Sequence, residues 1–348
     1  MSAQQIQKIC LLRLSAIGDC CHALAVVRTL QKHLPDAQLT WIIGKVEAGL
    51  MANLDGVELL VYDKRASRKR RRAFATELRQ REFDVLLNMH ASWRANRVSR
   101  WVRTPRKIGF DRARARDCQW LFTNESIASQ HRPHVIDGFF GFAERLGVTA
   151  REYAWGLPLA DSDYELAERI IDGEQPLVVI SPCSSDRRNN FRNWPAAHFV
   201  QVANHVADRY GATIVVTGAG SAAEHEYAEW IRNDGPAGTH DLVGKTSLKE
   251  LAALIDRAIV VLCPDSGPAH MASATGTPVV GLYATSNPGR TGPVLNPEYT
   301  VDAYPQALQK YLGKRVEEVR WGQRVRHEAA MLLVDVEAVL QKLDALLA

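Results

Sequence analysis

The segment 259–283 has the sequence IVVLCPDSGPAHMASATGTPVVGLY, and its pattern decides the fold. It contains a short β-branched run, a polar loop that opens a helical segment, and a second β-branched run, at 259–263, 268–275 and 278–283. A strand, a helix and a second strand in this order are typical of a parallel sheet covered by helices. Pro268 suits the first turn of a helix, and Gly267 before it allows a ligand close to the backbone.

The same alternation continues along the rest of the chain. In the second half, strands are expected at 177–181 and 213–217, and helices at 195–210, 221–233, 247–257, 303–315 and 333–347. In the first half, strands are expected at 9–14, 39–43, 58–62, 84–89 and 106–110, and helices at 22–34, 66–81, 93–103 and 134–146. The polar stretch 149–174 between the two series predicts a connection between domains.

Two such series predict an α/β protein with two doubly wound, Rossmann-like domains, each built on a parallel sheet. We expect the first domain over 1–155, the second over 156–330, and a C-terminal helix within 331–348 that can pack back on the first domain. Sheets of this kind bind ligands beyond the carboxyl ends of their strands. The loops that follow strands are therefore the places to look for functional residues.

The composition indicates an ordinary globular protein of 348 residues, 46% hydrophobic and 24% charged. No apolar run approaches the ~20 residues of a membrane span. The polar N-terminus contains no apolar run of signal-peptide length, which predicts a cytoplasmic location. The six cysteines form no CxxC pair, so buried free thiols are expected rather than a disulfide or metal site.

Charge is unevenly distributed between the two halves. Residues 1–150 carry 25 Lys and Arg against 14 Asp and Glu, whereas residues 151–348 carry 18 against 25. A basic half predicts an anionic partner, which can be a nucleic acid, an anionic lipid surface or an acidic glycolipid. No familiar nucleic-acid module is visible, which favours the other two. The densest basic stretch is 64–72, with further arginines up to Arg116.

Two loops in the second half carry residues suited to phosphate. Backbone amides at the start of the 268–275 helix are unpaired and favour an anion, and Asp265, Ser266 and His270 add polar groups there. The loop 182–195 contributes the hydroxyls of Ser184 and Ser185, and Arg192, whose guanidinium matches phosphate geometry. A plain helix cap and a solvated charged loop are the alternatives.

A third loop, Thr217-Gly218-Ala219-Gly220-Ser221-Ala222-Ala223, matches the loose dinucleotide fingerprint GxGxxA. Asp241 lies roughly twenty residues further on, where a ribose-binding acid is expected. This match supports an alternative function, an NAD(P)-dependent oxidoreductase. Against it, the loop does not follow the first strand of either domain. Glu224, just inside the next helix, can instead bind a ribose hydroxyl.

Asp19 lies in the turn between the first strand and the first helix. Aspartate is a common helix cap, which is the plain interpretation. A single carboxylate at this position can also act as a general base toward an acceptor hydroxyl. No second carboxylate follows nearby to form a pair of the glycosidase kind.

The chain resembles the ADP-heptose:lipopolysaccharide heptosyltransferases of glycosyltransferase family 9, and looks closest to the heptosyltransferase I type. Six stretches carry the resemblance: LLRLSAIGDCCHALAVVRTL (11–30), WIIGKVEA (41–48), KIGFDRARARDCQWLFTN (107–124), HVIDG (134–138), RNWP (192–195) and PDSGPAHMASATGTPVVGLY (264–283). The resemblance implies a GT-B fold and an inverting transfer of heptose from ADP-heptose to Kdo of the lipid A inner core. A non-catalytic sugar-nucleotide or nucleic-acid binding protein is the third alternative.

The resemblance also implies roles for individual residues. Asp19 matches the general base, and Arg192 the cation at the leaving diphosphate. The residues implied in donor binding are Ser184, Ser185, Arg192, Glu224, Lys245, Thr246, Asp265, Ser266, Gly267, Pro268 and His270. Those expected at the acceptor are Arg65, Arg68, Lys69, Arg71, Arg72, Arg116 and His134. No metal or cofactor is implied, and the lipid acceptor implies peripheral association with the cytoplasmic face of the inner membrane.

Overall fold

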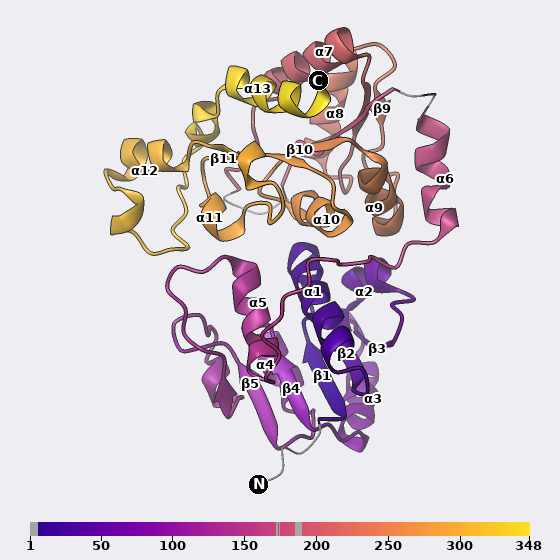
Figure 1. Cartoon of the computed structure of the whole chain (residues 1–348), viewed down its shortest axis with the longest axis vertical. Helices are drawn as coiled ribbons and strands as arrows, with labels where there is room; N and C mark the ends of the chain where they lie inside the picture. The colour runs from indigo at the N-terminus through magenta and orange to yellow at the C-terminus, as the bar shows by residue number, and fades with distance from the viewer. Residues whose placement is uncertain (1–5, 172, 174, 185–189) are drawn as a thin grey trace. The chain divides into compact units, whose positions relative to one another are not determined.

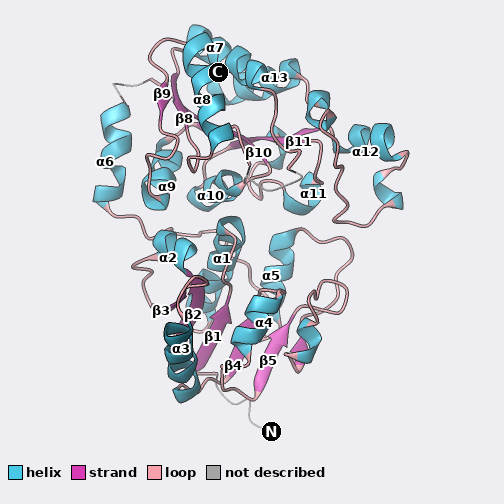
Figure 2. Cartoon of the chain, turned by 180° about the vertical axis from the view of Figure 1, so that it is seen from behind, coloured by secondary structure: helices cyan, strands magenta, loops and turns pink. Residues whose placement is uncertain are grey.

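The computed structural model describes residues 6–171, 173, 175–184 and 190–348, and the chain forms two compact units (Figure 1). The first unit is Met1–Pro158 and the second is Leu159–Ala348. Each unit holds one six-stranded sheet with helices on both faces (Figure 2). All strand pairs in the described part of the chain are parallel.

The sheet of the first unit has the strand order β3-β2-β1-β4-β5-β6. Its strands are β1 (Lys8–Leu12), β2 (Gln38–Gly44), β3 (Val57–Tyr62), β4 (Val85–Asn88), β5 (Arg106–Gly109) and β6 (Glu125–Ser126). The helices are α1 (Ile17–His33), α2 (Lys45–Met51), α3 (Arg68–Gln80), α4 (Trp93–Ser99) and α5 (Val135–Glu144), with a 3-10 turn η1 (Gln119–Leu121). In the register, Ile9 of β1 lies between Leu39 of β2 and Val85 of β4.

The sheet of the second unit has the order β12-β11-β10-β7-β8-β9. Its strands are β7 (Leu177–Ile180), β8 (Thr213–Val216), β9 (His240–Asp241), β10 (Val260–Pro264), β11 (Val279–Tyr283) and β12 (Val301–Asp302). The helices are α6 (Asp161–Ile170), α7 (Ala196–Tyr210), α8 (Ala222–Asp234), α9 (Leu248–Arg257), α10 (Gly267–Thr275), α11 (Pro288–Thr291), α12 (Tyr304–Leu312) and α13 (Val336–Leu347). Three 3-10 turns are η2 (Pro297–Tyr299), η3 (Val316–Glu318) and η4 (Ala330–Leu333).

The two sheets share one topology. When the strands of the second unit are renumbered 1 to 6 in chain order, its sheet, read from β9 to β12, has the order 3-2-1-4-5-6. This is also the order of the first sheet. The order of connection reverses between β1 and β4 in the first unit and between β7 and β10 in the second. In doubly wound sheets, ligands bind at the carboxyl ends of the strands on either side of this reversal. The loops after these four strands are therefore the structural centres of the two candidate sites.

Hydrophobic side chains on both faces of each sheet hold the helices in place. In the first unit, α3 and α4 contribute Leu78 and Val98 to a core cluster with alternate residues of β1, and α1 packs against α5. In the second, α7, α8 and α12 share a cluster with the strands, while α9 packs against α6 and α10. Strands buried on both faces explain why they are continuous apolar runs rather than alternating ones.

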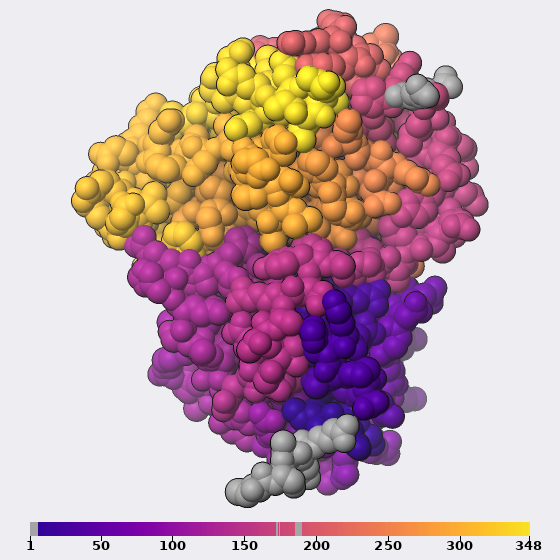
Figure 3. All heavy atoms as spheres, viewed as in Figure 1, coloured from indigo at the N-terminus to yellow at the C-terminus, as the bar shows by residue number. Residues whose placement is uncertain are grey.

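The connecting and closing segments each contain a helix of the second unit. The stretch 149–174 contains α6, whose Ala167 and Ile170 are buried and which packs on α9. The C-terminal helix α13 packs on α7 (Figure 3). The expected domain bounds, and packing of the C-terminal helix on the first domain, stay predictions. Asp344 of α13 accepts hydrogen bonds from His205 and Tyr210, at 2.7 and 2.9 Å.

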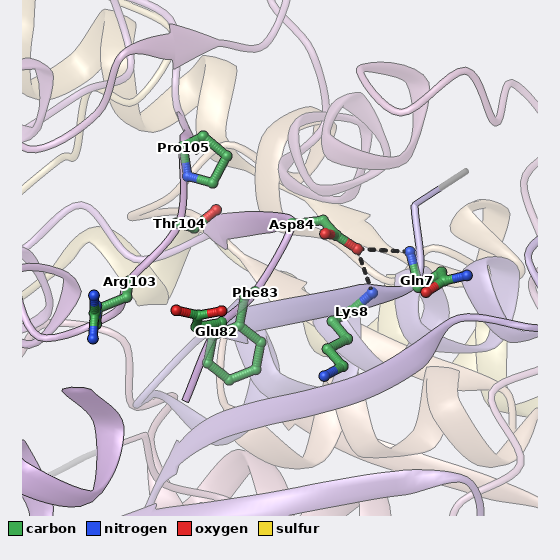
Figure 4. Close-up of a pocket in the computed structure, with 8 residues that line it drawn as sticks. All are labelled: Gln7, Lys8, Glu82, Phe83, Asp84, Arg103, Thr104 and Pro105. Atoms are coloured by element: carbon green, nitrogen blue, oxygen red, sulfur yellow. Dashed lines mark hydrogen bonds between the residues drawn. The ribbon is translucent and has the colours of Figure 1, made fainter. Parts of the chain in front are cut away.

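A hollow of about 520 Å³ lies at the amino ends of the strands of the first sheet (Figure 4). Asp84 lies within it, and one oxygen of its carboxylate accepts the backbone N–H groups of Gln7 and Lys8, both at 2.8 Å. The hollow is also lined by Phe83, Arg103 and Thr104. This edge is opposite to the one where parallel sheets bind ligands, so Asp84 is best explained as the group that ties β1 to β4.

Candidate functional site

In the first unit, Asp19 lies where β1 passes into α1. The helix begins at Ile17, so Asp19 is the third residue of its first turn. Its Oδ2 atom forms an ion pair with Arg13 and accepts the backbone N–H of Ala16 at 3.4 Å. Ala16 is the N-cap residue of α1, so Asp19 lies at the third helical position and contacts the N-cap backbone from there. Its side chain is nevertheless 33% exposed, so the carboxylate reaches solvent.

Arg13, which was not predicted as a site residue, fixes this carboxylate. Its side chain is only 11% exposed. One Nη atom donates to the carbonyl of Met89 at 2.6 Å, the other pairs with Asp19, and the guanidinium lies 5.3 Å from the Phe139 ring centre. The sequence does contain a signal for this pair, because Arg13 lies within the apolar run ICLLRL (9–14). A cation that is buried with such a run requires a partner of opposite charge or a hydrogen-bond acceptor.

His90 is the second residue missed at this edge. It follows β4, and its Nδ1 atom accepts the backbone N–H of Leu14 at 3.2 Å. Burial, reinforced by the positive charge of Arg13, lowers the pKa of His90 to about 3. The imidazole is therefore neutral at physiological pH, with its hydrogen on Nε2, because Nδ1 is an acceptor.

In the second unit, Arg192 and Asp265 form the corresponding ion pair. Nη1 of Arg192 donates to the backbone carbonyl of Asp265 at 2.7 Å and lies 3.4 Å from its Oδ2 atom. Here the side chain of Arg192 is 14% exposed and that of Asp265 is 8% exposed. The arginine is therefore the more exposed partner, whereas in the first unit the aspartate is. Asn190 holds the guanidinium from the other side, accepting from Nε at 3.3 Å. The pair fixes a cation beside the start of α10.

Hydroxyl groups surround the start of α10. Ser184 is buried, and its hydroxyl donates to Asn190 at 2.8 Å; Ser185 lies outside the described residues. Ser266 is the N-cap residue of α10, but its hydroxyl makes no capping bond to that helix. Gly267 and Pro268 are the first two residues of α10, and His270, the fourth, is half-buried. Anion binding by the first-turn amides of α10 stays a prediction.

Ser286 was not predicted. It follows β11, is 5% exposed, and its hydroxyl has no hydrogen-bond partner among the described residues. A buried hydroxyl without a partner is costly and points to a ligand or water that completes it. The polar run Thr285-Ser286-Asn287 directly after a strand was the available signal.

The glycine loop 217–223 has a structural explanation. Gly220 has a positive φ of 94°, and a Cβ atom there would lie 3.3 Å from the Cα atom of Gly244. Glu224 binds back to the loop, accepting the backbone N–H groups of Ala219 at 3.0 Å and Ser221 at 2.7 Å. These contacts account for both glycine and glutamate without a dinucleotide; ribose binding by Glu224 stays a prediction.

The other predicted donor residues lie after β9. The ammonium group of Lys245 donates to the backbone carbonyl of Asp241 at 2.7 Å, and Thr246 is half-buried. Asp241, which the fingerprint assigns to a ribose, thus binds the lysine and also accepts the backbone N–H of Val243 at 2.9 Å. A role for Lys245 and Thr246 in donor binding stays a prediction.

The predicted acceptor residues are spread over three places. Arg65, Arg68, Lys69, Arg71 and Arg72 are exposed around the start of α3, which follows the outermost strand β3. Arg116 is exposed in the loop after β5. His134 is the N-cap of α5: its Nδ1 accepts the backbone N–H of Ile136 at 3.2 Å, and its ring meets that of His22 edge-on. Their acceptor roles stay predictions.

Burial raises the pKa of Glu47, in the first turn of α2, while a backbone hydrogen bond and the positive charges of Lys64, Arg13 and Arg94 oppose this shift. No group of three or more metal-ligating side chains occurs in the described ranges, and no described helix is long and apolar enough to span a membrane. All six cysteines are free thiols.

Comparison with known proteins decides the family. Residues 71–314 match glycosyltransferase family 9 (heptosyltransferase). The chain is 39% identical over 340 residues to the lipopolysaccharide core heptosyltransferase OpsX of Haemophilus influenzae, covering 98% of this chain and 97% of that protein. The chain belongs to glycosyltransferase family 9.

Solved structures of family 9 proteins share the fold. A glycosyltransferase family 9 protein from Veillonella parvula gives a TM-score of 0.79 at 20% identity, covering 100% of this chain and 99% of that one. The Escherichia coli heptosyltransferase WaaC with ADP gives 0.74 at 19%, covering 98% and 100%. The predicted GT-B fold and glycosyltransferase activity are confirmed, and the oxidoreductase alternative gains no support.

Proposed function

We propose that this family 9 enzyme transfers L-glycero-D-manno-heptose from ADP-heptose to Kdo of the lipid A inner core, with inversion at the anomeric carbon. The observation that carries the proposal is the opposite exposure of two Arg–Asp pairs. At the first sheet the carboxylate of Asp19 is 33% exposed beside a buried Arg13, whereas at the second sheet both partners are mostly buried, with Arg192 slightly more exposed than Asp265, at 14% against 8%. One site thus offers a base, and the other a cation for a diphosphate.

The relatives support the choice of sugar and pathway. OpsX, which this chain matches at 39% identity over nearly its whole length, is a lipopolysaccharide core heptosyltransferase. A protein of Pseudomonas aeruginosa named lipopolysaccharide heptosyltransferase 1 is 23% identical over 301 residues, covering 82% of this chain and 81% of that protein. A lipid acceptor fits the excess of Lys and Arg in residues 1–150, because the inner core carries carboxylates and phosphates.

The acceptor half of the reaction uses the first site. Asp19 accepts the proton of the attacking acceptor hydroxyl, whose oxygen forms the new bond to the anomeric carbon. Arg13 holds the carboxylate in one orientation, so the base is in place before the acceptor arrives. The Nε2–H group of neutral His90 supplies a hydrogen-bond donor at the same edge of the sheet. Arg65, Arg68, Lys69, Arg71, Arg72, Arg116 and His134 bind the acidic groups of the acceptor.

The donor half uses the second site. The bond between the anomeric carbon and the β-phosphate oxygen breaks, and its electron pair leaves with ADP. Arg192 and the first amides of α10, from Gly267, stabilise the charge that develops on the leaving diphosphate. Ser184, Ser185, Ser266 and His270 bind its oxygens, and Glu224, Lys245 and Thr246 bind the nucleoside. The reaction takes place at the cytoplasmic face of the inner membrane, where the lipid acceptor is held.

The test is an incubation of the purified protein with ADP-heptose and a panel of truncated acceptors that end in Kdo, phosphorylated Kdo or a first heptose. The proposal expects one product heavier by a single heptosyl unit on a Kdo acceptor, with one ADP released per transfer. Products found only on the heptose-terminated acceptor would reject Kdo as the acceptor. No product on any acceptor, with ADP-heptose intact, would reject the proposed donor as well.

A further inference from the structure

The first unit carries a cluster of large apolar side chains on its surface. Trp93, Trp120 and Leu121 are 53%, 41% and 71% exposed. Phe122 connects them, because it follows Leu121 in the chain and its ring meets that of Trp93 edge-on, with centres 6.4 Å apart. We call these four residues the aromatic patch. Soluble proteins rarely leave neighbouring apolar groups of this size in water without a function.

Hydrogen bonds hold the patch in a fixed shape. The backbone N–H of Trp93 donates to the carboxylate of Asp117 at 2.9 Å, and the amide of Asn96 donates to the carbonyl of Asp117 at 2.8 Å. Buried Gln119 donates to the carbonyl of Asn88 at 2.9 Å, at the end of β4. The start of α4 and the loop that carries η1 therefore form one surface built on the sheet.

Arginines border the patch. The guanidinium of Arg112 lies 3.6 Å from the ring centre of Trp120, and Arg94, Arg97 and Arg116 are exposed on α4 and in the same loop. The exposed acid of this loop, Asp117, is bound by the Trp93 backbone amide. The patch is thus apolar at its centre and positive at its rim.

We propose that the aromatic patch and three of its bordering arginines, Arg94, Arg97 and Arg112, dock this enzyme on an anionic lipid bilayer. Tryptophan rings favour the level of the lipid headgroups, and arginines next to them pair with anionic phosphates. Leu121, the most exposed member, favours a bilayer over a single-stranded nucleic acid, because an aliphatic side chain provides no stacking surface. The inference rests on the proposed function only for the lipid nature of the acceptor.

Vesicle flotation without donor or acceptor tests the docking surface. The protein should float with vesicles of phosphatidylglycerol and phosphatidylethanolamine but not with phosphatidylcholine alone, and less at high salt. The variant Trp93→Ser/Trp120→Ser/Leu121→Ser should lose at least tenfold in vesicle affinity. The matched control Trp230→Ser/Leu332→Ser removes residues of similar exposure from the second unit and should bind like the wild type. Thermal unfolding verifies that each variant is folded.

Turnover on a deacylated, water-soluble Kdo acceptor separates docking from catalysis. The triple variant should transfer heptose to this acceptor at the wild-type rate while failing to float. Equal flotation of triple variant and wild type, or stronger binding of the wild type to an oligonucleotide than to anionic vesicles, would overturn the docking proposal. Loss of soluble-acceptor turnover in a folded triple variant would overturn it too, and place the patch in the acceptor site. Patch-dependent flotation without any transfer by the wild type would reject the proposed function alone.

Discussion

The two sheets of this enzyme share one strand order but present opposite chemistry at the point where that order reverses. Arg13 and Arg192 are each mostly buried, and each donates to a backbone carbonyl and pairs with an aspartate. In the first unit the aspartate is the more exposed partner, at 33% against 11%; in the second the arginine is, at 14% against 8%. Under the proposed function, the first pair supplies the base and the second supplies the cation.

The comparison shows that one strand order can carry two different arrangements of charge at its ligand-binding edge. A duplicated topology supplies two equivalent ligand-binding edges, and the loops decide which charge each edge presents. Where the loop leaves the carboxylate in solvent, the arginine serves to orient it. Where the loop buries the carboxylate, the aspartate serves to orient the arginine. Substitutions in each pair test whether the difference in exposure sets the role of the pair.

Loss of the cation in the second unit should have the largest effect. Replacement Arg192→Ala removes the group that we propose binds the leaving diphosphate, and we expect kcat/KM to fall by about 10²–10³-fold. Steady-state kinetics with ADP-heptose measure this, and Arg192→Lys should recover part of the loss by retaining the charge. A drop below threefold for Arg192→Ala would show that the second pair is structural.

Loss of the cation in the first unit should have a smaller effect on turnover and a visible one on stability. In Arg13→Ala, Asp19 keeps its bond from Ala16 but loses its orienting partner, so kcat should fall about tenfold or more. Because Asp19 reaches solvent, the free energy of unfolding should fall by only about 1–2 kcal/mol. Urea unfolding and turnover of Arg13→Ala and Arg13→Lys measure the two effects. Full turnover in a destabilised Arg13→Ala protein would remove Arg13 from the mechanism.

The neutral imidazole beside the first pair makes a pH prediction. The folded-state pKa of His90, about 3, lies below the ordinary value of 6.5. Between these values the unfolded chain binds a proton that the folded chain does not, so stability falls as pH decreases below about 6.5. The contribution from pH 7 to pH 5 is about 2 kcal/mol at most.

Urea unfolding at pH 7 and pH 5 tests this contribution in the wild type and in His90→Asn. The asparagine oxygen takes the position of Nδ1 and can still accept the Leu14 amide, but it does not titrate. The variant should lose less stability than the wild type on acidification. Identical losses in the two proteins would show that His90 is protonated in the folded state.

Ser286→Ala should have the smallest effect and is specific to the second unit. Removal of a buried hydroxyl without a protein partner should leave the free energy of unfolding unchanged or slightly higher, while ADP affinity falls about three- to tenfold. Calorimetry of ADP binding measures this. Ser99→Ala is the control, because Ser99 is also buried but bonds to the carbonyl of Asn96 in the first unit. Unchanged ADP affinity in Ser286→Ala would separate Ser286 from the donor site.

Much of the fold was predictable because buried parallel strands are continuous apolar runs. The exceptions have physical reasons. Helix α6 begins with Asp161-Ser162-Asp163, which resembles a linker but also suits the positive end of a helix dipole. Helix α1 starts at Ile17 rather than near His22, because the Asp19 carboxylate satisfies the amide of Ala16. Strands β6, β9 and β12 have two residues each, too few for a pattern.

Site residues could be predicted where the residue type itself indicates a chemical role. They could not be predicted where the role depends on a contact between distant positions in the chain. Asp19, Arg192 and the start of α10 follow strands in the sequence. Their partners are distant: Arg13 meets a carbonyl 76 positions away, and Arg192 a carbonyl 73 positions away. Sequence spacing alone does not reveal that two arginines at equivalent places have opposite exposure relative to their aspartates.

The most direct test of this difference compares Asp19→Asn with the wild type in two assays, heptosyl transfer and ADP binding. The account predicts that transfer falls at least about 100-fold, because the amide accepts no proton, while the dissociation constant for ADP changes less than twofold. Transfer at the wild-type rate, or a parallel loss of ADP affinity, would contradict the assignment of the base to the first unit and the diphosphate to the second.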